Sequence, residues 1–221
     1  MKQVFFAICL GLTFGFVACA GSDKEAAKTG EATAAGAATA SAKTFNVDAT
    51  GSKVNWTGFG VGHNHTGTLG IKEGTVMVDN GNVTGGKFTF DMAQIGVTDA
   101  TPADKASQLV GHLSKGFFAT DSFATSSFEI TKAEALTGNA DATHTITGNL
   151  TLRGITKSVS FPAKVTVNGN EVATTATFKI DRTLWNVMEN SKNNKLFDMK
   201  KMADNLVNDE VELKLDIKAK G

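Results

Sequence analysis

The chain has 221 residues, and its 22 Lys and Arg balance its 22 Asp and Glu, so it carries no excess positive charge that would attract nucleic acid. It contains 15 Phe, 23 Gly, no Tyr and only 2 Pro, and Val, Thr, Ile and Phe recur in short runs, which favours one β-rich domain. The hydrophobic fraction of 41% is sufficient for a folded core.

Residues 1–19 are typical of a bacterial lipoprotein signal. One Lys precedes an uncharged apolar stretch from Val4 to Ala18, and Cys19 follows directly. This stretch is shorter than the roughly 20 residues that a membrane-spanning helix needs. We expect cleavage before Cys19, acylation of Cys19 and a lipid-anchored position at the bacterial cell envelope, on the periplasmic or the outer-membrane face. An ordinary signal peptide with an incidental cysteine and a retained membrane span are the alternatives.

The other cysteine, Cys9, lies inside the apolar stretch and would be removed with it. The mature chain would then have one Cys. We therefore expect no intramolecular disulfide, no Cys-based metal site and no thiol catalyst.

Residues 20–43 form a low-complexity segment. It holds 10 Ala, 3 Thr, 3 Gly and 2 Ser among 24 residues, and it has no large apolar side chain. Such a segment cannot bury enough surface to offset its loss of conformational entropy. We expect a disordered linker that joins the lipid anchor to a folded domain over residues 44–221.

Apolar and polar side chains alternate with period two in the folded domain. Clear examples lie in residues 53–57, 87–92, 145–152 and 210–217, and such segments are typical of half-buried strands. Because continuous apolar runs are missing, the strands are expected to pair antiparallel. Strand starts are expected near residues 44, 52, 63, 73, 83, 125, 142, 156, 170 and 208, with two or so merging to give about eight strands.

One helix interrupts the strands. Thr101 suits its N-cap and Pro102 its first helical position, and an apolar stripe at helical spacing runs from Ala106 to Leu113, before Gly116. One short helix cannot cover an eight-stranded sheet, so the sheet is expected to close on itself. The predicted fold is all-β: an eight-stranded antiparallel barrel with one short helix, whose interior holds side chains or one small ligand.

Common catalytic and nucleotide-binding motifs do not occur: the sequence has no GxSxG, HExxH, GxxxxGK[ST] or strand-embedded GxGxxG. Catalytic residues and cofactors are therefore not expected. His63 and His65 share a strand face near one rim of the barrel, and His112 lies close to the end of the helix. Three such side chains would suit a metal, but a hydrogen-bonded polar rim is favoured, and contacts to a ligand headgroup are a further alternative.

Several side chains flank the expected openings of the barrel. Arg182 follows a strand in which Phe178 faces inward, so alternation places Arg182 inward as well. A lone inward Arg usually pairs with a carboxylate, and an anionic headgroup is the alternative partner. Phe117 and Phe118 after the helix, and Trp185 after Arg182, are candidates for lining the mouth.

A set of short motifs extends over nearly all of residues 44–220. The stretches are Val54–Gly58, His65–Gly67, Gly85–Phe88, Gly111–Phe118, Ser127–Thr131, Gly148–Lys157 and Ile180–Asn186. In order and spacing they resemble the YceI-like family of lipocalin-like, polyisoprenoid-binding proteins. The sequence departs from this family in residues 119–124, where a usual acidic, Tyr-Pro-containing stretch is replaced, and in the Lys- and Asn-rich residues 192–205.

The resemblance implies a lipocalin-like barrel whose hydrophobic cavity binds a long isoprenoid or similar amphiphile at the cell envelope, with no catalytic residue. The cavity lining is expected from Trp56, Phe88, Phe90, Phe117, Phe118, Phe128, Leu150, Phe178 and Trp185, and a polar mouth from His65, His112 and Arg182. The expected partners are this lipid and, through Cys19, a membrane; a homodimer is left open. A protein-interaction lipoprotein with a filled barrel and a metal-dependent enzyme at the histidines are the alternative functions.

Overall fold

The computed structural model describes residues 26–36, 41–100 and 102–221. The expected signal peptide, Cys19 and Thr101 therefore lie outside the described residues. The strands are β1 (Lys28–Glu31), β2 (Lys43–Val47), β3 (Lys53–Gly60), β4 (Asn64–Asp79), β5 (Asn82–Val97), β6 (Thr125–Ala135), β7 (His144–Leu152), β8 (Ile155–Asn168), β9 (Glu171–Asp181) and β10 (Val207–Lys220). The helices are α1 (Ala103–His112), continued by a π-helical turn (Leu113–Phe117), a 3-10 turn (Arg182–Trp185), α2 (Met199–Met202) and a second 3-10 turn (Ala203–Asn205).

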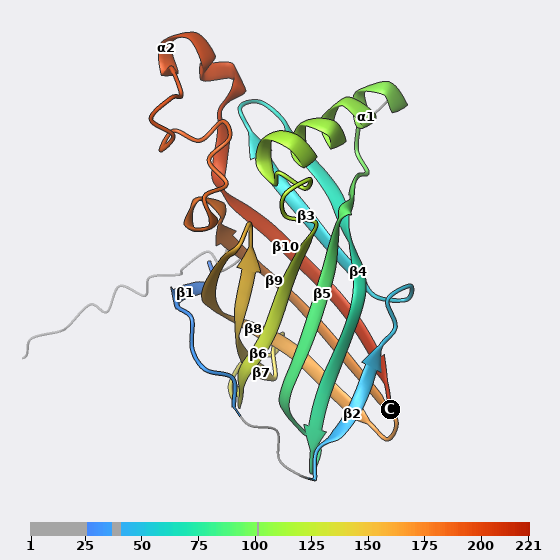
Figure 1. Ribbon diagram of the computed structural model, residues 1–221. Coiled ribbons are helices and arrows are strands. Elements are labelled where there is room, and N and C mark those ends of the chain that lie inside the picture. The colour runs from blue at the N-terminus through green and yellow to red at the C-terminus, as the bar shows by residue number, and fades with distance from the viewer. Residues whose placement is uncertain (1–25, 37–40, 101) are drawn as a thin grey trace, which may run out of the picture.

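Strands β3 to β10 form a closed antiparallel barrel, as Figure 1 shows. Each strand pairs with its neighbour in sequence, and β10 returns to pair with β3. Trp56 of β3, for example, lies opposite Gly67 of β4 on one side and Leu213 of β10 on the other. The eight-stranded antiparallel barrel is confirmed, and the strand starts predicted near 63 and 73 merge into the single long strand β4.

Two short strands complete the wall of the barrel. Strand β2 lies between β4 and β10 beyond the end of β3, so β2 and β3 share one position in the sheet. Strand β1 pairs antiparallel with β8, with Thr29 opposite Val159. It follows a parallel bridge between Ala26 and Lys179 of β9.

Strand β1 corrects the expectation that the whole of residues 20–43 is a disordered linker. Strands β8 and β9 pair with each other only through residues 164–168 and 171–175. Along the rest of their length, the edges of β8 and β9 that face each other do not pair with each other. Residues 26–31 lie along these edges: Ala27 donates its N–H to the carbonyl of Lys179 at 2.8 Å, and the Lys157 ammonium lies 2.8 Å from the Glu31 carboxylate. The segment follows a free strand edge, which supplies backbone partners to almost any sequence.

The core lies inside the barrel because every second side chain of each strand points inward. On β8, for example, Val159, Phe161, Ala163 and Val165 are buried, while the residues between them are more exposed. The β4–β5 turn contains Asn80 and Gly81, both with positive φ, as a two-residue hairpin turn requires.

Helix α1 begins one residue later than predicted. Pro102 takes the N-cap position rather than the first helical position, and its side chain makes no capping hydrogen bond. The predicted apolar stripe turns toward the barrel: Leu109 lies on the cavity described below, and Leu113 is buried. The helix then continues as a π-helical turn to Phe117 instead of ending before Gly116.

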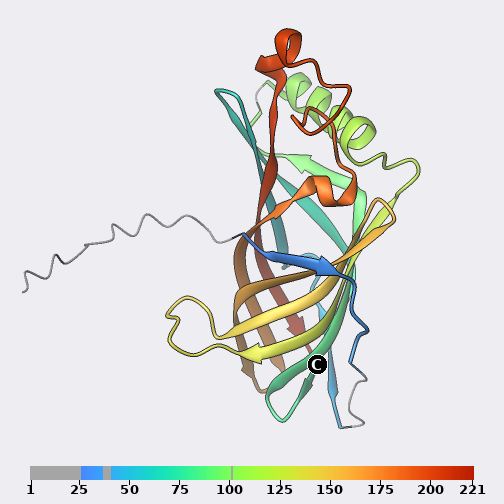
Figure 2. The same ribbon diagram turned by 90° about the vertical axis from the view of Figure 1, so that its left-hand side faces the viewer.

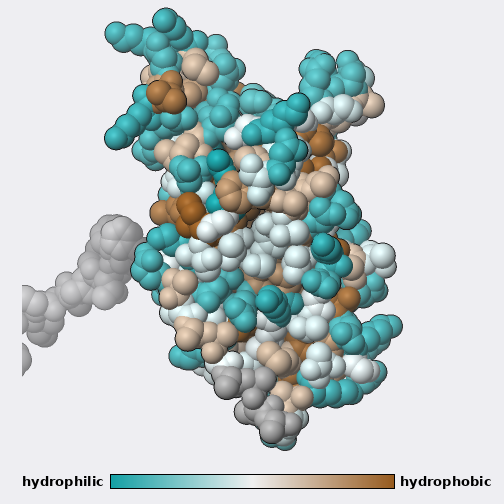
Figure 3. Space-filling model, in the orientation of Figure 1, coloured by the Kyte–Doolittle hydropathy of each residue, from teal (hydrophilic) through white to brown (hydrophobic). Residues whose placement is uncertain are grey.

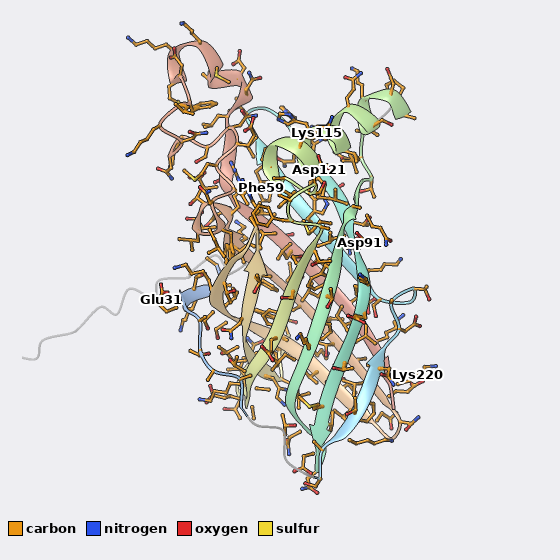
Figure 4. The ribbon with its side chains drawn as sticks, in the orientation of Figure 1. Glu31, Phe59, Asp91, Lys115, Asp121 and Lys220 are labelled. Carbon is orange, nitrogen blue, oxygen red and sulfur yellow. The ribbon has the colours of Figure 1, made fainter. Side chains whose placement is uncertain are left out.

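The two ends of the barrel differ. Figures 1 and 2 show α1 and the segment that carries α2 at one end, whereas β2 and the C-terminus lie at the other. Figure 4 shows the same two ends: Lys115 lies near α1, and Lys220 lies at the opposite end of the barrel. None of the helices in the described ranges is long and apolar enough to span a membrane.

Candidate functional site

The barrel encloses a cavity of about 360 Å³, which opens at the α1 end, since Leu109 and His112 of α1 contribute to its lining. This volume is within the range of small-molecule binding pockets. Its walls are mostly aliphatic and aromatic side chains of β3 to β10, and they reach from Leu206 beside the opening to Val76 and Val165 deep in the barrel. The predicted residues that line it are Trp56, Phe88, Phe90, Phe117, Phe118, Phe128, Leu150 and Phe178.

Aromatic rings form a connected layer across the cavity. Phe88 contacts Phe128, with 6.4 Å between ring centroids, and Phe128 contacts Phe161 at 5.8 Å. Phe161 stacks on Phe178 at 3.9 Å with an interplanar angle of 8°. Phe161 was missing from the predicted site, although its place in the alternating run of residues 159–165 marks it as inward-facing.

The prediction that Trp185 lines the cavity is wrong. It is fully buried, with 0% exposure, and it does not line the cavity. Its indole N–H donates to the carbonyl of Leu150 at 3.0 Å, so the side chain fixes the 3-10 turn Arg182–Trp185 against β7. The chain leaves the strand conformation after Asp181, so inward and outward positions no longer alternate there.

The histidines His63, His65 and His112 are among the residues that line the cavity. His63 and His65 both line the opening, with 5.1 Å between their ring centroids. The Nδ1 atom of His65 lies 3.1 Å from a carboxylate oxygen of Asp99, and the other Asp99 oxygen accepts the backbone N–H of Thr66 at 2.9 Å. The side chain of His65 therefore already has a partner within the fold.

His112, at the end of α1, lines another part of the mouth. Its Nε2 atom lies 3.9 Å from a carboxylate oxygen of Glu189, on the segment between β9 and β10. Its ring also contacts Phe117 edge-on, with 5.5 Å between centroids. His112 therefore connects α1 to the segment on the other side of the opening.

Arg182 lies below the mouth and is 3% exposed. Its guanidinium donates to the carbonyl oxygens of Val187, Val207 and Asn208, and it lies 3.8 Å from the carboxylate of Asp209. Burial lowers the pKa of Arg182 from its ordinary value, and Asp209 opposes this shift. Arg182 also lines the cavity. Its hydrogen bonds and its carboxylate partner show that it joins the start of β10 to the segment that follows β9.

Arg153 was not predicted. It forms the β7–β8 turn with Gly154, both with positive φ, and its guanidinium donates to the carbonyls of Phe117 at 3.1 Å and Asn186 at 2.6 Å. It therefore fixes the π-helical turn beside the mouth. Its place in the Gly148–Lys157 motif was visible, but the motif alone does not indicate which backbone groups the side chain contacts.

Among the residues that the structure describes, no group of three or more His, Cys, Asp or Glu side chains lies close enough together to hold a metal ion. The three histidines instead have different polar partners: the carbonyl of Val61 for His63, Asp99 for His65 and Glu189 for His112. The metal-dependent alternative has no ligand cluster in this part of the chain.

One polar atom in the cavity wall has no partner. The indole N–H of Trp56 is buried without a hydrogen bond to any described residue. An unpaired buried donor costs about 1–3 kcal/mol, and a ligand oxygen would satisfy it. The site as a whole is an apolar tube with a polar opening, which suits an elongated apolar molecule with one polar end.

Several solved structures are similar to this chain in fold, including the following two. The structure of Burkholderia cenocepacia BcnA is 22% identical, with 78% of this chain and 99% of that chain covered at a TM-score of 0.58. A polyisoprenoid-binding domain from Saccharophagus degradans, implicated in plant cell wall breakdown, is 12% identical, with 80% and 98% covered at a TM-score of 0.58. No curated protein matches the sequence. The model of the YceI-like domain matches residues 45–219, and the chain therefore belongs to the YceI-like family.

Proposed function

We propose that this protein binds a long apolar amphiphile, a polyisoprenoid or a similar lipid, in the barrel cavity and carries or sequesters it without chemical change. The apolar cavity of about 360 Å³ is the observation that supports this function. It is open space between side chains of all eight barrel strands, which disfavours the alternative of a barrel filled by its own side chains. The similarity in fold to a polyisoprenoid-binding domain supports the same ligand class.

Burial of the hydrocarbon chain supplies the affinity. Each methylene-sized group that leaves water contributes about 0.8 kcal/mol. The aromatic layer through Phe128, Phe161 and Phe178 offers contact area without polar selection. The headgroup would lie at the mouth beside His63 and His65, and weak headgroup specificity follows.

The polar groups at the mouth have partners within the fold. His65 is held by Asp99, and Arg182 by three backbone carbonyls and Asp209. Arg182 is held by these partners within the fold, whereas His65 uses only Nδ1 for Asp99. The support for binding is therefore the mostly apolar lining of the cavity, which offers contact area to a hydrocarbon chain.

The proposed location is the bacterial cell envelope. The support is the sequence of residues 1–19, with the apolar stretch Val4–Ala18 directly before Cys19. Acylation of Cys19 would hold the barrel beside the membrane from which an apolar ligand is drawn. Mass spectrometry of the N-terminal peptide tests this directly, because an acyl mass on Cys19 is required.

The test of binding is native mass spectrometry of the full chain purified from a bacterial envelope, followed by organic extraction and identification of the bound molecule. A stoichiometric apolar adduct is expected. Leu213→Trp should abolish this adduct, because it places a bulky indole ring into the cavity between Trp56 and Phe178. Leu184→Trp is the matched control, because Leu184 is 40% exposed and lies outside the cavity lining. A chain that stays free of adduct after incubation with polyprenyl compounds would overturn the proposal.

A further inference from the structure

A short segment projects beyond the mouth of the barrel. Residues 192–202, here called the tip, include α2 and lie between β9 and β10 in the sequence. They project from the same end of the barrel as α1, on the other side of the opening from α1 (Figures 1 and 2). The tip is attached directly to the cavity: Asn190 before it and Asp204, Asn205 and Leu206 after it line the opening. Whatever the tip contacts therefore lies next to the mouth.

The tip exposes apolar side chains that the fold does not use. Leu196 is 90% exposed and Met199 is 50% exposed, the two highest values among the large hydrophobic residues described. Figure 3 shows hydrophobic surface in this projecting part, surrounded by hydrophilic surface. The chain holds Leu196 in place locally, since Asn194 accepts the backbone N–H of Leu196 at 3.0 Å and donates to the carbonyl of Met188 at 3.1 Å.

Lysines surround these two side chains. Lys192, Lys195, Lys200 and Lys201 are all exposed. The only carboxylate within the tip is Asp198, which caps α2 through the backbone N–H of Lys200 and lies 3.7 Å from the ammonium of Lys201. The other three lysines have no carboxylate within ion-pair distance in the described structure, so the tip carries excess positive charge.

We propose that the tip docks on an anionic lipid bilayer and thereby places the mouth of the barrel at the membrane surface. Leu196 and Met199 would enter the boundary between headgroups and acyl chains, and the four lysines would lie among the anionic headgroups. The proposal rests on the proposed function for its purpose, because an apolar ligand that passes from the bilayer into the cavity then avoids bulk water.

The shape of the tip favours a lipid surface over a protein partner. A stable protein interface needs about 1,000 Å² or more of complementary surface, whereas the tip offers two large apolar side chains on a projection. Long lysine side chains extend their charged ends toward headgroups while their methylene stems follow apolar surface.

The experiment installs a reporter at the tip of the full chain. The Leu196→Trp variant is reconstituted with vesicles of phosphatidylglycerol and brominated phosphatidylcholine, and the emission of the unsubstituted chain, from Trp56 and Trp185, is subtracted. Emission should shift to the blue and be quenched by bromine. Asn168→Trp is the matched control: Asn168 is exposed at the β8–β9 turn, beside the C-terminus at the opposite end, and should be unaffected. All variants share one N-terminus, so differences report the tip.

Charge is tested in the same reporter. Changing all four tip lysines to Gln should lower the equilibrium constant for contact at least roughly tenfold, and replacing phosphatidylglycerol by phosphatidylcholine should have a similar effect. Two results would overturn the docking proposal. One is emission from the Leu196→Trp reporter that stays unquenched on anionic vesicles, and the other is quenching that the Lys→Gln changes leave intact.

The same preparations separate this inference from the proposed function. Native mass spectrometry of the Lys→Gln variant should still show the apolar adduct, because the cavity is unchanged. A ligand-bound chain whose tip does not contact the bilayer contradicts only the docking. A chain that contacts the bilayer but never holds an apolar molecule contradicts only the carrier function.

Discussion

The indole ring of Trp56 lies directly over Gly67, its partner on the neighbouring strand β4. A β-carbon at residue 67 would overlap both this ring and the carbonyl oxygen of Gly96. Glycine is therefore required for close approach rather than for an unusual backbone angle. The pair sets how far Trp56 extends into the cavity.

Gly67→Ala should therefore displace the Trp56 ring, destabilise the fold by about 1–3 kcal/mol and reduce the amount of bound ligand. The measurements are urea unfolding, tryptophan emission and extraction of bound lipid. Gly111→Ala on α1 is the control, because nothing lies within 4 Å of a β-carbon there, and a helical alanine should be neutral or slightly stabilising. Equal unfolding midpoints for Gly67→Ala and the unsubstituted chain would contradict this role of Gly67.

Arg182 should contribute more to stability than to ligand affinity. Arg182→Met removes a charge that is paired with Asp209 and donates to three carbonyls, and breaking such a buried network costs about 3 kcal/mol. Denaturant unfolding of the variant checks this value. Adding Asp209→Asn should recover part of the loss, since it removes the unpaired carboxylate. A variant of normal stability that has lost its ligand would instead assign the headgroup to Arg182.

Acid should loosen the corner of the mouth at Asp99. Burial raises the pKa of Asp99, but the backbone N–H of Thr66 and the ring of His65 more than offset this, so the pKa lies below its ordinary value of 3.8. Because the folded-state pKa is lowered, the stabilisation is complete above about pH 4 and is lost as the pH falls through the folded-state pKa.

Asp99→Asn should therefore lower stability at neutral pH, and its difference from the unsubstituted chain should shrink below about pH 4. Urea midpoints across this range provide the measurement. Hydrogen bonds from Gly51 and Gln94 also lower the pKa values of Asp48 and Asp91, but these carboxylates are present in both proteins and cancel in the difference. A difference that does not change with pH would show that Asp99 acts only through packing.

Strand β1 should protect the backbone amides of β8 and β9 from hydrogen exchange where these two strands do not pair with each other, a region here called the seam. Ala27→Pro removes the N–H that Ala27 donates to the carbonyl of Lys179. Hydrogen exchange of residues 155–163 and 176–181 should accelerate, as followed by mass spectrometry. Ala35→Pro is the control, because Ala35 lies in the same alanine-rich segment but its backbone N–H donates no hydrogen bond to a described residue. Equal exchange in the two variants would mean that β1 does not stabilise the seam.

The barrel follows from the sequence because period-two alternation is a local signal that the fold preserves. In β10, Val211, Leu213, Leu215 and Ile217 all line the cavity, as their spacing predicts. Strand β1 carries no such signal, since Lys28–Glu31 forms a strand only because β8 presents a free edge. Trp185 was misplaced for a related reason: it ends the 3-10 turn that begins at Arg182, where the period changes.

The partners of the mouth residues also depend on distant parts of the chain. Asp99 follows β5, and Glu189 and Asp209 lie after β9, so no local pattern links them to His65, His112 and Arg182. The sequence indicates which side chains are polar at the rim. Only the closed barrel determines which of them meet.

The attachment of residues 26–31 to the barrel wall shortens the tether of the proposed lipoprotein. Between Cys19 and Ala26 only residues 20–25 remain, and even fully extended they span at most about 25 Å. If Cys19 carries the lipid, the barrel stays within a small hemisphere around its own anchor. Such a protein would serve as a local reservoir that exchanges lipid with the bilayer holding it, rather than as a shuttle that crosses from one membrane to another.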